Sequence, residues 1–165
     1  MQQPEFHRPL QADRITVSGI AHHIEATASE RAALARRLGI PALGMLVCDF
    51  RLTRVGQGVI AAEAGLRARA TRVCVVSLDE FESDVTFEFA VRFVPAARES
   101  EDIDPEAVDE IPYEGEKIDL GEAAVQELAL ALDPYPRRAD AELPAGASEP
   151  PVSPFVVLRS RGRAN

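Results

Sequence analysis

Between residues 44 and 94, successive runs of the chain alternate apolar and polar side chains with the two-residue period of β-strands that bury one face. The alternation is clear in MLVCDFRLTRV, from Met45, and resumes after the GQG tripeptide in VIAAEAGLRARATRV. GQG therefore predicts a hairpin turn between two strands. The residues expected to face inward are Leu46, Cys48, Phe50 and Leu52 in the first strand, and Ile60, Ala62, Ala64, Leu66, Ala68 and Ala70 in the second.

The stretch DVTFEFAVRFV, residues 84–94, has the sharpest alternation in the chain. CVVSLDE, residues 74–80, is expected to continue the preceding hairpin toward it. Consecutive strands with short connections and one polar face favour an antiparallel sheet. We therefore predict an α+β fold, with an antiparallel, barrel-like β-sheet, two main α-helices packed against it and a flexible acidic loop. The expected inward residues of 84–94 are Val85, Phe87, Phe89, Val91 and Phe93.

The N-terminal part predicts two short strands followed by a helix. The strands are DRITVSG and GIAHHIEAT, on either side of Gly19, and the second alternates in hydropathy. Thr27 is a suitable N-cap, and Glu30 stands three residues later as its capping-box partner. Gly39 is placed to end the helix. The side of the second strand expected to face the core carries Ile20, His22, Ile24 and Ala26.

A second helix is predicted over residues 119–132, in the stretch DLGEAAVQELALAL. Asp119 is a good N-cap, with Glu122 as the expected capping-box partner. Pro134 and Pro136 cannot continue the helix, so the chain leaves it as an extended segment. The helix should be amphipathic and dock on the sheet. Its apolar flank is Leu120, Ala124, Val125, Leu128, Ala131 and Leu132.

Length and composition predict one globular domain over residues 1–165, of which 46% are hydrophobic. Residues 96–117 are expected to form a flexible acidic loop, 134–154 a proline-rich linker, and 155–165 a C-terminal tail that is apolar and then basic. The chain shows neither a long uncharged apolar run nor a secretion-signal layout. We therefore expect a cytoplasmic protein.

The net charge of −9 is concentrated in the C-terminal part of the chain. Residues 1–99 hold 12 basic and 12 acidic side chains, whereas residues 100–165 hold 6 and 15. Residues 99–116 alone contain nine acids and no base. Such a block repels itself and favours a solvated loop. An acidic chain is also poorly suited to coating nucleic acid, because that affinity comes from neutralising phosphates.

The residue types that carry catalysis do not form a recognisable catalytic pattern in this sequence. His22 and His23 are adjacent, so on a strand they face opposite ways and cannot coordinate the same metal ion. Serine has no nucleophile-elbow context, and no catalytic pairing of cysteine with histidine is present. Cys48 and Cys74 are far apart and fit reduced core residues. We therefore expect no enzymatic activity, no cofactor and no metal.

The order of several motifs resembles the YceD family, the large ribosomal RNA subunit accumulation proteins. The motifs are ERAALARRLGI, then LRARATRVCVVSLDEFESDVTFEFAVRFVP, an acidic loop, IDLGEAAVQELALALDPYPRR and finally SPFVVL. The resemblance covers nearly the whole chain. It implies a bacterial cytoplasmic factor that supports ribosome biogenesis, with no established enzymatic activity. Many relatives pair a cysteine near position 74 with others near the C-terminus, an arrangement suited to zinc. This chain keeps only Cys74, so a metal is not carried over.

The family implies no agreed functional residues, so candidate contacts come from charge. One hypothesis is a ribosome-assembly factor that binds large-subunit ribosomal RNA or a ribosomal protein through arginines. The alternative is an acidic protein-interaction adaptor that makes no direct contact with RNA. We expect neither a membrane nor DNA among the partners. The candidate arginines are Arg67, Arg69 and Arg72 around the alanine-rich strand, and Arg137, Arg138, Arg159, Arg161 and Arg163 toward the C-terminus.

Overall fold

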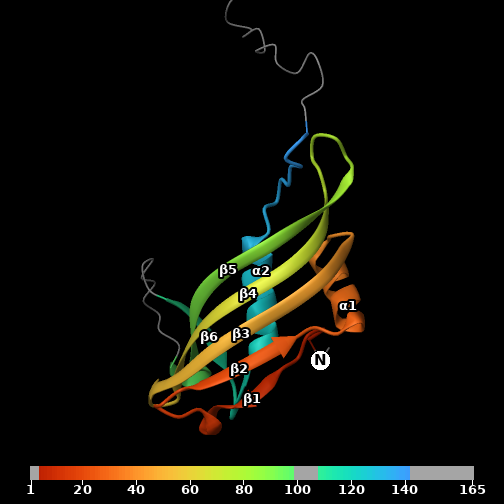
Figure 1. The fold of residues 1–165 in the computed structure, drawn as a ribbon. Helices are drawn as coiled ribbons and strands as arrows, with labels where there is room; N and C mark the ends of the chain where they lie inside the picture. Colours follow the sequence, from red (N-terminus) through yellow and green to blue (C-terminus); the bar gives the residue numbers. More distant parts are fainter. Residues whose placement is uncertain (1–3, 99–107, 142–165) are drawn as a thin grey trace, which may run out of the picture.

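A computed structural model describes residues 4–98 and 108–141 of the chain (Figure 1). Its main sheet has five strands in the order β2-β3-β4-β5-β6, and β1 and β7 form a separate two-stranded ribbon. The strands are β1 (Pro9–Gln11), β2 (Ile20–Glu25), β3 (Ala42–Gly56), β4 (Val59–Val73), β5 (Glu80–Pro95), β6 (Asp109–Tyr113) and β7 (Lys117–Asp119). The helices are α1 (Ala28–Leu38) and α2 (Leu120–Ala131), with short 3-10 turns at Ala12–Arg14 and Ala96–Arg98.

Strands β3, β4 and β5 form a long antiparallel meander, as the alternating pattern predicted. The predicted hairpin turn is confirmed: Gly56 and Gly58 have positive φ, and so does Gln57 between them. The inward residues predicted for β3 and β4 are buried, Leu46, Leu52, Ile60 and Leu66 completely so. Burial of this row of apolar side chains is what fixes the register of the meander, because a slip of one residue would expose all of them.

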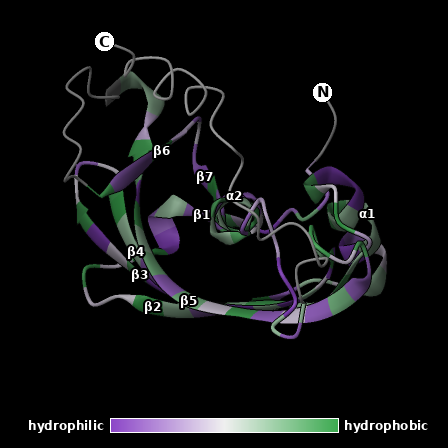
Figure 2. Ribbon diagram, turned by 90° about the horizontal axis from the view of Figure 1, so that it is seen from above, coloured by the Kyte–Doolittle hydropathy of each residue, from purple (hydrophilic) through white to green (hydrophobic). Residues whose placement is uncertain are grey.

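The sheet is open, so the prediction of a barrel-like sheet is wrong. Its two outermost strands in the described residues are β2 and β6, and β6 runs parallel to β5, so the sheet is also mixed. Figure 2 shows a strongly curved sheet with α2 in its concave side. Alternation predicts that one face of the sheet is buried. It does not show whether other strands or a helix pack against that face. Here a helix fills the space, and the α+β class stands.

Helix α1 begins and ends as predicted. The Thr27 hydroxyl accepts a hydrogen bond from the Glu30 N–H while the Glu30 carboxylate accepts one from the Thr27 N–H. Gly39 adopts the left-handed conformation and closes the helix. The helix lies at the end of the sheet beside β3 (Figure 1). Its Arg37 donates to the Glu122 carboxylate of α2 at 2.8 and 2.5 Å, which ties the two helices together.

Helix α2 has the predicted N-cap but lacks the predicted capping box. The Asp119 carboxylate accepts hydrogen bonds from the N–H groups of Gly121 and Glu122. Glu122 does not bond back to the cap, because its carboxylate is held by Arg37. Of the predicted apolar flank, Leu120, Ala124, Val125 and Leu128 are buried, whereas Ala131 is exposed. Neither helix is long and apolar enough to cross a membrane, among the residues described.

Three further segments differ from the sequence-based expectations. Residues 13–19 form a 3-10 turn and loop where a strand was expected, and 74–79 form a turn with Leu78 at positive φ. The segment 96–117, expected to be an acidic loop, contains β6, while residues 99–107 lie outside the described part. On β5, Phe87, Phe89 and Phe93 face the core as predicted, although only Phe93 is fully buried and Phe87 and Phe89 stay partly exposed. The linker and tail predicted beyond residue 141 also lie outside the described part.

Candidate partner-binding surface

Arg67 and Arg69 lie on the outer face of β4, which neither α1 nor α2 covers. Arg67 donates to Asp49 of β3 at 3.2 Å. Arg69 donates to both carboxylate oxygens of Asp84 on β5, at 2.7 and 3.4 Å. The guanidinium of Arg69 accordingly lowers the pKa of Asp84. Both candidate arginines therefore already have carboxylate partners within the sheet.

Arg72 is separated from those two arginines because it lies on the inner side of the sheet. Its exposed fraction is 9%, and it is the one buried charged residue in the described part of the chain. Its guanidinium donates to the carbonyl oxygen of Asp133, just beyond the C-terminus of α2. A cation at that end of a helix offsets the partial negative charge of the last carbonyls. Arg72 thus has the position of a helix-capping residue.

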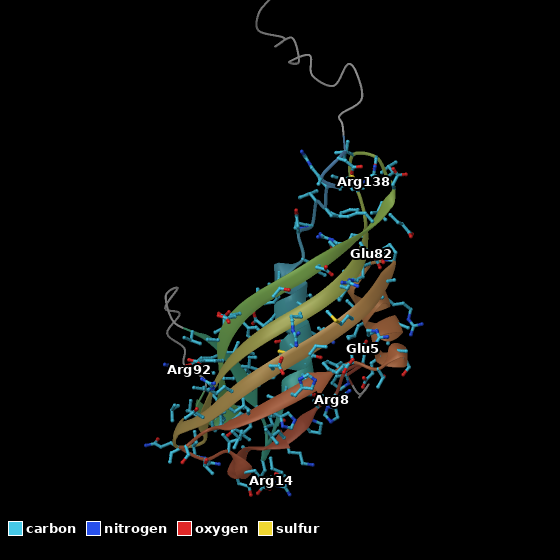
Figure 3. All side chains as sticks on the ribbon, in the orientation of Figure 1. Glu5, Arg8, Arg14, Glu82, Arg92 and Arg138 are labelled. Atoms are coloured by element: carbon cyan, nitrogen blue, oxygen red, sulfur yellow. The ribbon has the colours of Figure 1, made fainter. Side chains whose placement is uncertain are left out.

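The segment after α2 folds back beside the turn between β4 and β5. The Val75 N–H donates to the Pro136 carbonyl at 2.9 Å. Arg138 pairs with Asp140 at 2.5 Å and approaches Asp79 at 3.6 Å, at the upper end of the molecule in Figure 3. Arg137 is exposed. The remaining candidates, Arg159, Arg161 and Arg163, lie outside the described residues.

Cys74 sits in this junction, and its thiol is surrounded by hydrogen-bond donors. Its Sγ accepts from the Arg138 N–H at 3.5 Å. That contact, followed by donation from the Ser77 N–H and hydroxyl, lowers the pKa of the Cys74 thiol to about 7. Cys48, by contrast, lies deep in the sheet, and burial raises its pKa to about 12. Both cysteines are free and buried, as predicted, but their thiols differ in acidity.

Around Cys74, the described residues do not bring together the three ligands that would hold a metal ion. Ser77 stands where a second thiol of a C-x-x-C pair would be, and among the described residues no three His, Cys, Asp or Glu side chains are grouped to hold an ion. A cavity of about 590 Å³ lies beside the thiol, between the C-terminal ends of α1 and α2. Its two arginines, Arg37 and Arg72, are already held by Glu122 and the Asp133 carbonyl.

A row of acidic side chains, which was not predicted from the sequence, runs along β5. The outward side chains of β5 include Glu80, Glu82, Asp84 and Glu88, and Asp79 precedes them in the turn. Residues 79–90 contain these five acids and no Lys or Arg. Only Asp79 and Asp84 have ion-pair partners in the described part of the chain. We call these five residues the acidic row. The sequence signal for this row is the strand alternation of residues 80–88, which places the acids on one face.

The acidic row borders a stretch of β5 that has a neighbouring strand on one side only. Strand β4 pairs with β5 over residues 80–93, whereas β6 pairs only with Val91–Pro95. Residues 80–90 therefore form an open edge, as far as the described residues extend. We call this stretch the β5 edge.

A shallow hollow of about 760 Å³ extends from the acidic row across the outer face of the sheet. Small residues from three strands line it, namely Ala21, Gly65 and Ala90. Apart from Gly65 and its two chain neighbours, no atom of the described residues lies within 4 Å of the place where a Cβ of Gly65 would be. Glu63, Glu88 and Asp49 also line the hollow, against a single arginine, Arg51. The hollow thus continues the acidic surface inward from the β5 edge.

Comparison with known proteins identifies the family of the chain but adds no solved relative. A family model described as "Large ribosomal RNA subunit accumulation protein YceD" matches residues 62–153, more than half of the chain. The match confirms the resemblance that the motifs indicated, over a shorter stretch than nearly the whole chain. It includes the acidic row, Cys74 and α2. No curated protein and no solved structure matches the chain.

Proposed function

Because the chain belongs to the YceD family of large ribosomal RNA subunit accumulation proteins, we propose that it is a non-catalytic assembly factor that binds a basic ribosomal protein. The family description connects the protein with accumulation of large-subunit ribosomal RNA. The observation that carries the finer proposal is the difference between its arginines and its acids. The described candidate arginines are mostly engaged within the protein, whereas three acids of the acidic row are not.

The state of the arginines argues against RNA as the direct partner of the described surface. Affinity for RNA depends on cations that can neutralise phosphates. Arg67, Arg69 and Arg138 would each have to leave a carboxylate, and Arg72 would have to leave the end of α2. Phosphates would also approach the acidic row of β5, which repels them. These features favour a cationic protein partner.

The acids supply the complementary argument. Glu80, Glu82 and Glu88 have no ion-pair partner among the described residues, and they lie on one strand of a sheet face without a covering helix. Charge complementarity of this kind raises association rates and selects partners of opposite sign. A basic ribosomal protein held on this surface would be kept from premature contacts until it reaches its RNA site.

Deleting the gene tests the assembly role. The expected result is a lower ratio of large-subunit to small-subunit ribosomal RNA in the deletion strain, restored by the wild-type copy. An unchanged ratio would refute the role. In parallel, the tagged protein is captured from lysate with and without ribonuclease, over a salt series. A ribosomal protein retained after ribonuclease supports the proposal, whereas a partner lost on ribonuclease treatment favours direct RNA contact.

Arginine variants separate the second candidate, direct RNA binding, from the first. A copy with Arg137, Arg138, Arg159, Arg161 and Arg163 changed to alanine should rescue the deletion if the partner is a basic protein. A cooperative thermal unfolding transition is the control that this variant still folds. Failure of a folded five-alanine copy, together with loss of RNA from the captured complex, would assign the contact to the arginines instead.

A further inference from the structure

We propose that the β5 edge binds an extended basic segment of the partner protein as an additional strand of the sheet. The proposal rests on the proposed function, since it specifies which surface of this chain holds the basic partner. It combines three observations: an unpaired strand edge, the acidic row on one face of that strand, and partly exposed aromatic side chains on the other.

The edge is long enough to recognise a peptide by backbone hydrogen bonds. It spans residues 80–90, which corresponds to roughly 35 Å of extended chain. Figure 1 shows β5 at the border of the sheet, with β6 beside only its C-terminal end. An open edge presents unpaired N–H and C=O groups that can pair with another strand. Addition of a peptide to such an edge is a recurring mode of recognition.

The two faces of β5 determine which peptide fits. Glu82 and Glu88 project from the outer face, and Figure 3 shows Glu82 near the N-terminal end of the strand. On the inner face, Phe81, Val85, Phe87 and Phe89 remain partly exposed. Side chains of an added strand alternate between the same two faces. A fitting segment therefore alternates Lys or Arg, against the acids, with apolar residues that cover the aromatic rings.

The charge of the row excludes a second copy of this chain as the occupant. Pairing two β5 edges would bring two acidic rows side by side, and like charges on neighbouring strands destabilise the pairing. Charged side chains are a common protection of strand edges against such self-association. The same row attracts a cationic strand. The acidic hollow around Gly65 adjoins Glu88 and offers space to a long basic side chain.

Binding of a synthetic peptide to the full chain is the direct test. The probe is a fluorescent ten-residue peptide that alternates Lys or Arg with Val or Ile, measured by anisotropy at low salt. A peptide of the same pattern with Glu in place of the basic residues should not bind. N-methylation should abolish binding when it modifies the alternate backbone amides that face β5. Methylation of the other set of amides, which points away from β5, should have little effect. Equal effects of methylating either set, or no binding of the basic peptide, would overturn the proposal.

Matched variants locate the binding surface. Glu82→Gln together with Glu88→Gln should lower the affinity for the basic peptide by about three- to tenfold, as expected for the loss of two exposed ion pairs. The control is Glu114→Gln together with Glu116→Gln, which removes the same charge from exposed positions away from the edge. Equal affinity of the two double variants would overturn the assignment. The charge-reversed pair Glu82→Lys and Glu88→Lys should instead gain binding to the acidic peptide.

A single-stranded RNA oligonucleotide distinguishes the competing partner. RNA that displaces the basic peptide from the wild-type protein, and binds the glutamine variant more tightly, would assign the surface to RNA and overturn the proposal. In cells, failure of the β5-edge proposal can be distinguished from failure of the proposed assembly role. If the deletion lowers large-subunit RNA and the Glu82→Gln, Glu88→Gln copy restores it fully, the edge is wrong and the assembly role stands. If the deletion has no effect, the assembly role is wrong whatever the peptide does.

Discussion

Gly121, at the start of α2, lies directly against the backbone of Phe6. A Cβ built on Gly121 would overlap the Phe6 carbonyl oxygen and lie 2.8 Å from its carbonyl carbon. Phe6 itself is completely buried in the core. The absence of a side chain at position 121 is therefore what allows the N-terminal segment to cross the first turn of α2.

Gly121→Ala should destabilise the protein, although alanine is the better helix former. The helix propensity gain is about 1 kcal/mol, while overpacking against a backbone costs about 1–3 kcal/mol or more, so the net effect is unfavourable. Denaturant unfolding measures it. Gly65→Ala is the control, because it meets open space and lies on the sheet face. Equal stability of the two variants would show that the N-terminal segment is not fixed at this position.

Burial should decide the effect of shortening the aromatic side chains of β5. Phe93 is 1% exposed, so Phe93→Ala should lower the free energy of unfolding by about 3–5 kcal/mol. Phe89 is only partly buried, so Phe89→Ala should cost less, about 1–3 kcal/mol. The two free energies of unfolding can be compared by urea titration. A larger loss at Phe89 would mean that the open half of β5 is covered in solution.

The stabilising effect of Glu30 should depend on pH. Arg8 donates to both Glu30 carboxylate oxygens, at 2.7 and 2.8 Å, and with the Thr27 contacts this lowers the pKa of Glu30 to about 2. A lowered pKa in the folded state stabilises the protein above the ordinary value of 4.5 and loses that effect as pH falls toward 2. Glu30→Gln should therefore cost about 1–2 kcal/mol at pH 7.

The pH series itself contains the check on Glu30. The difference in stability between wild type and Glu30→Gln should shrink between pH 4.5 and 2. Asp13→Asn, a carboxylate with no ion-pair partner among the described residues, serves as the control and should show little change. A difference for Glu30→Gln that stays constant with pH would mean that packing, and not charge, explains its effect.

The two cysteines should differ in their reaction with iodoacetamide. The thiolate is the reactive form, and the pKa of Cys74 is lowered to about 7 by donors from Arg138 and Ser77. Cys74 has 0% exposed surface, but it lines the cavity between the segment after α2 and the turn that follows β4. Alkylation of Cys74 should rise with a midpoint near pH 7, while Cys48 should stay protected until unfolding. A Cys74→Ser variant that is modified equally fast would contradict this.

Local signals in the sequence predicted the parts of the fold that depend on neighbouring residues. The caps of α1 at Thr27 and Gly39 and the GQG hairpin follow from short-range geometry, and they are confirmed. The open sheet was not predicted, because closure depends on what occupies the concave side. The pairing of Glu122 with Arg37, in place of a capping box, joins residues from two helices and has no local signature.

For the candidate surface, the sequence supplied residue types but not their partners. Arg67 and Arg69 alternate along β4 with the alanines that were predicted to face inward, which fits their outward position. Only the strand register shows that Asp49 and Asp84 stand beside them. Arg72 follows the same strand but turns inward to α2. The β5 edge depends on where β6 stops, and a strand of five residues in an acidic segment gives too weak a pattern to predict that.

The pairing of β1 with β7 has a consequence for the order in which a newly made chain can fold. Pro9–Gln11 pairs with Lys117–Asp119, so the first strand has no partner until nearly all the described chain has been synthesised. At translation rates of about 5–20 residues per second, that wait is on the order of 5–20 s. The β3–β4–β5 meander, whose contacts are between successive strands, can form within that time. The N-terminal segment, with Phe6 still exposed, is then available to chaperones for several seconds before Gly121 and α2 emerge to receive it.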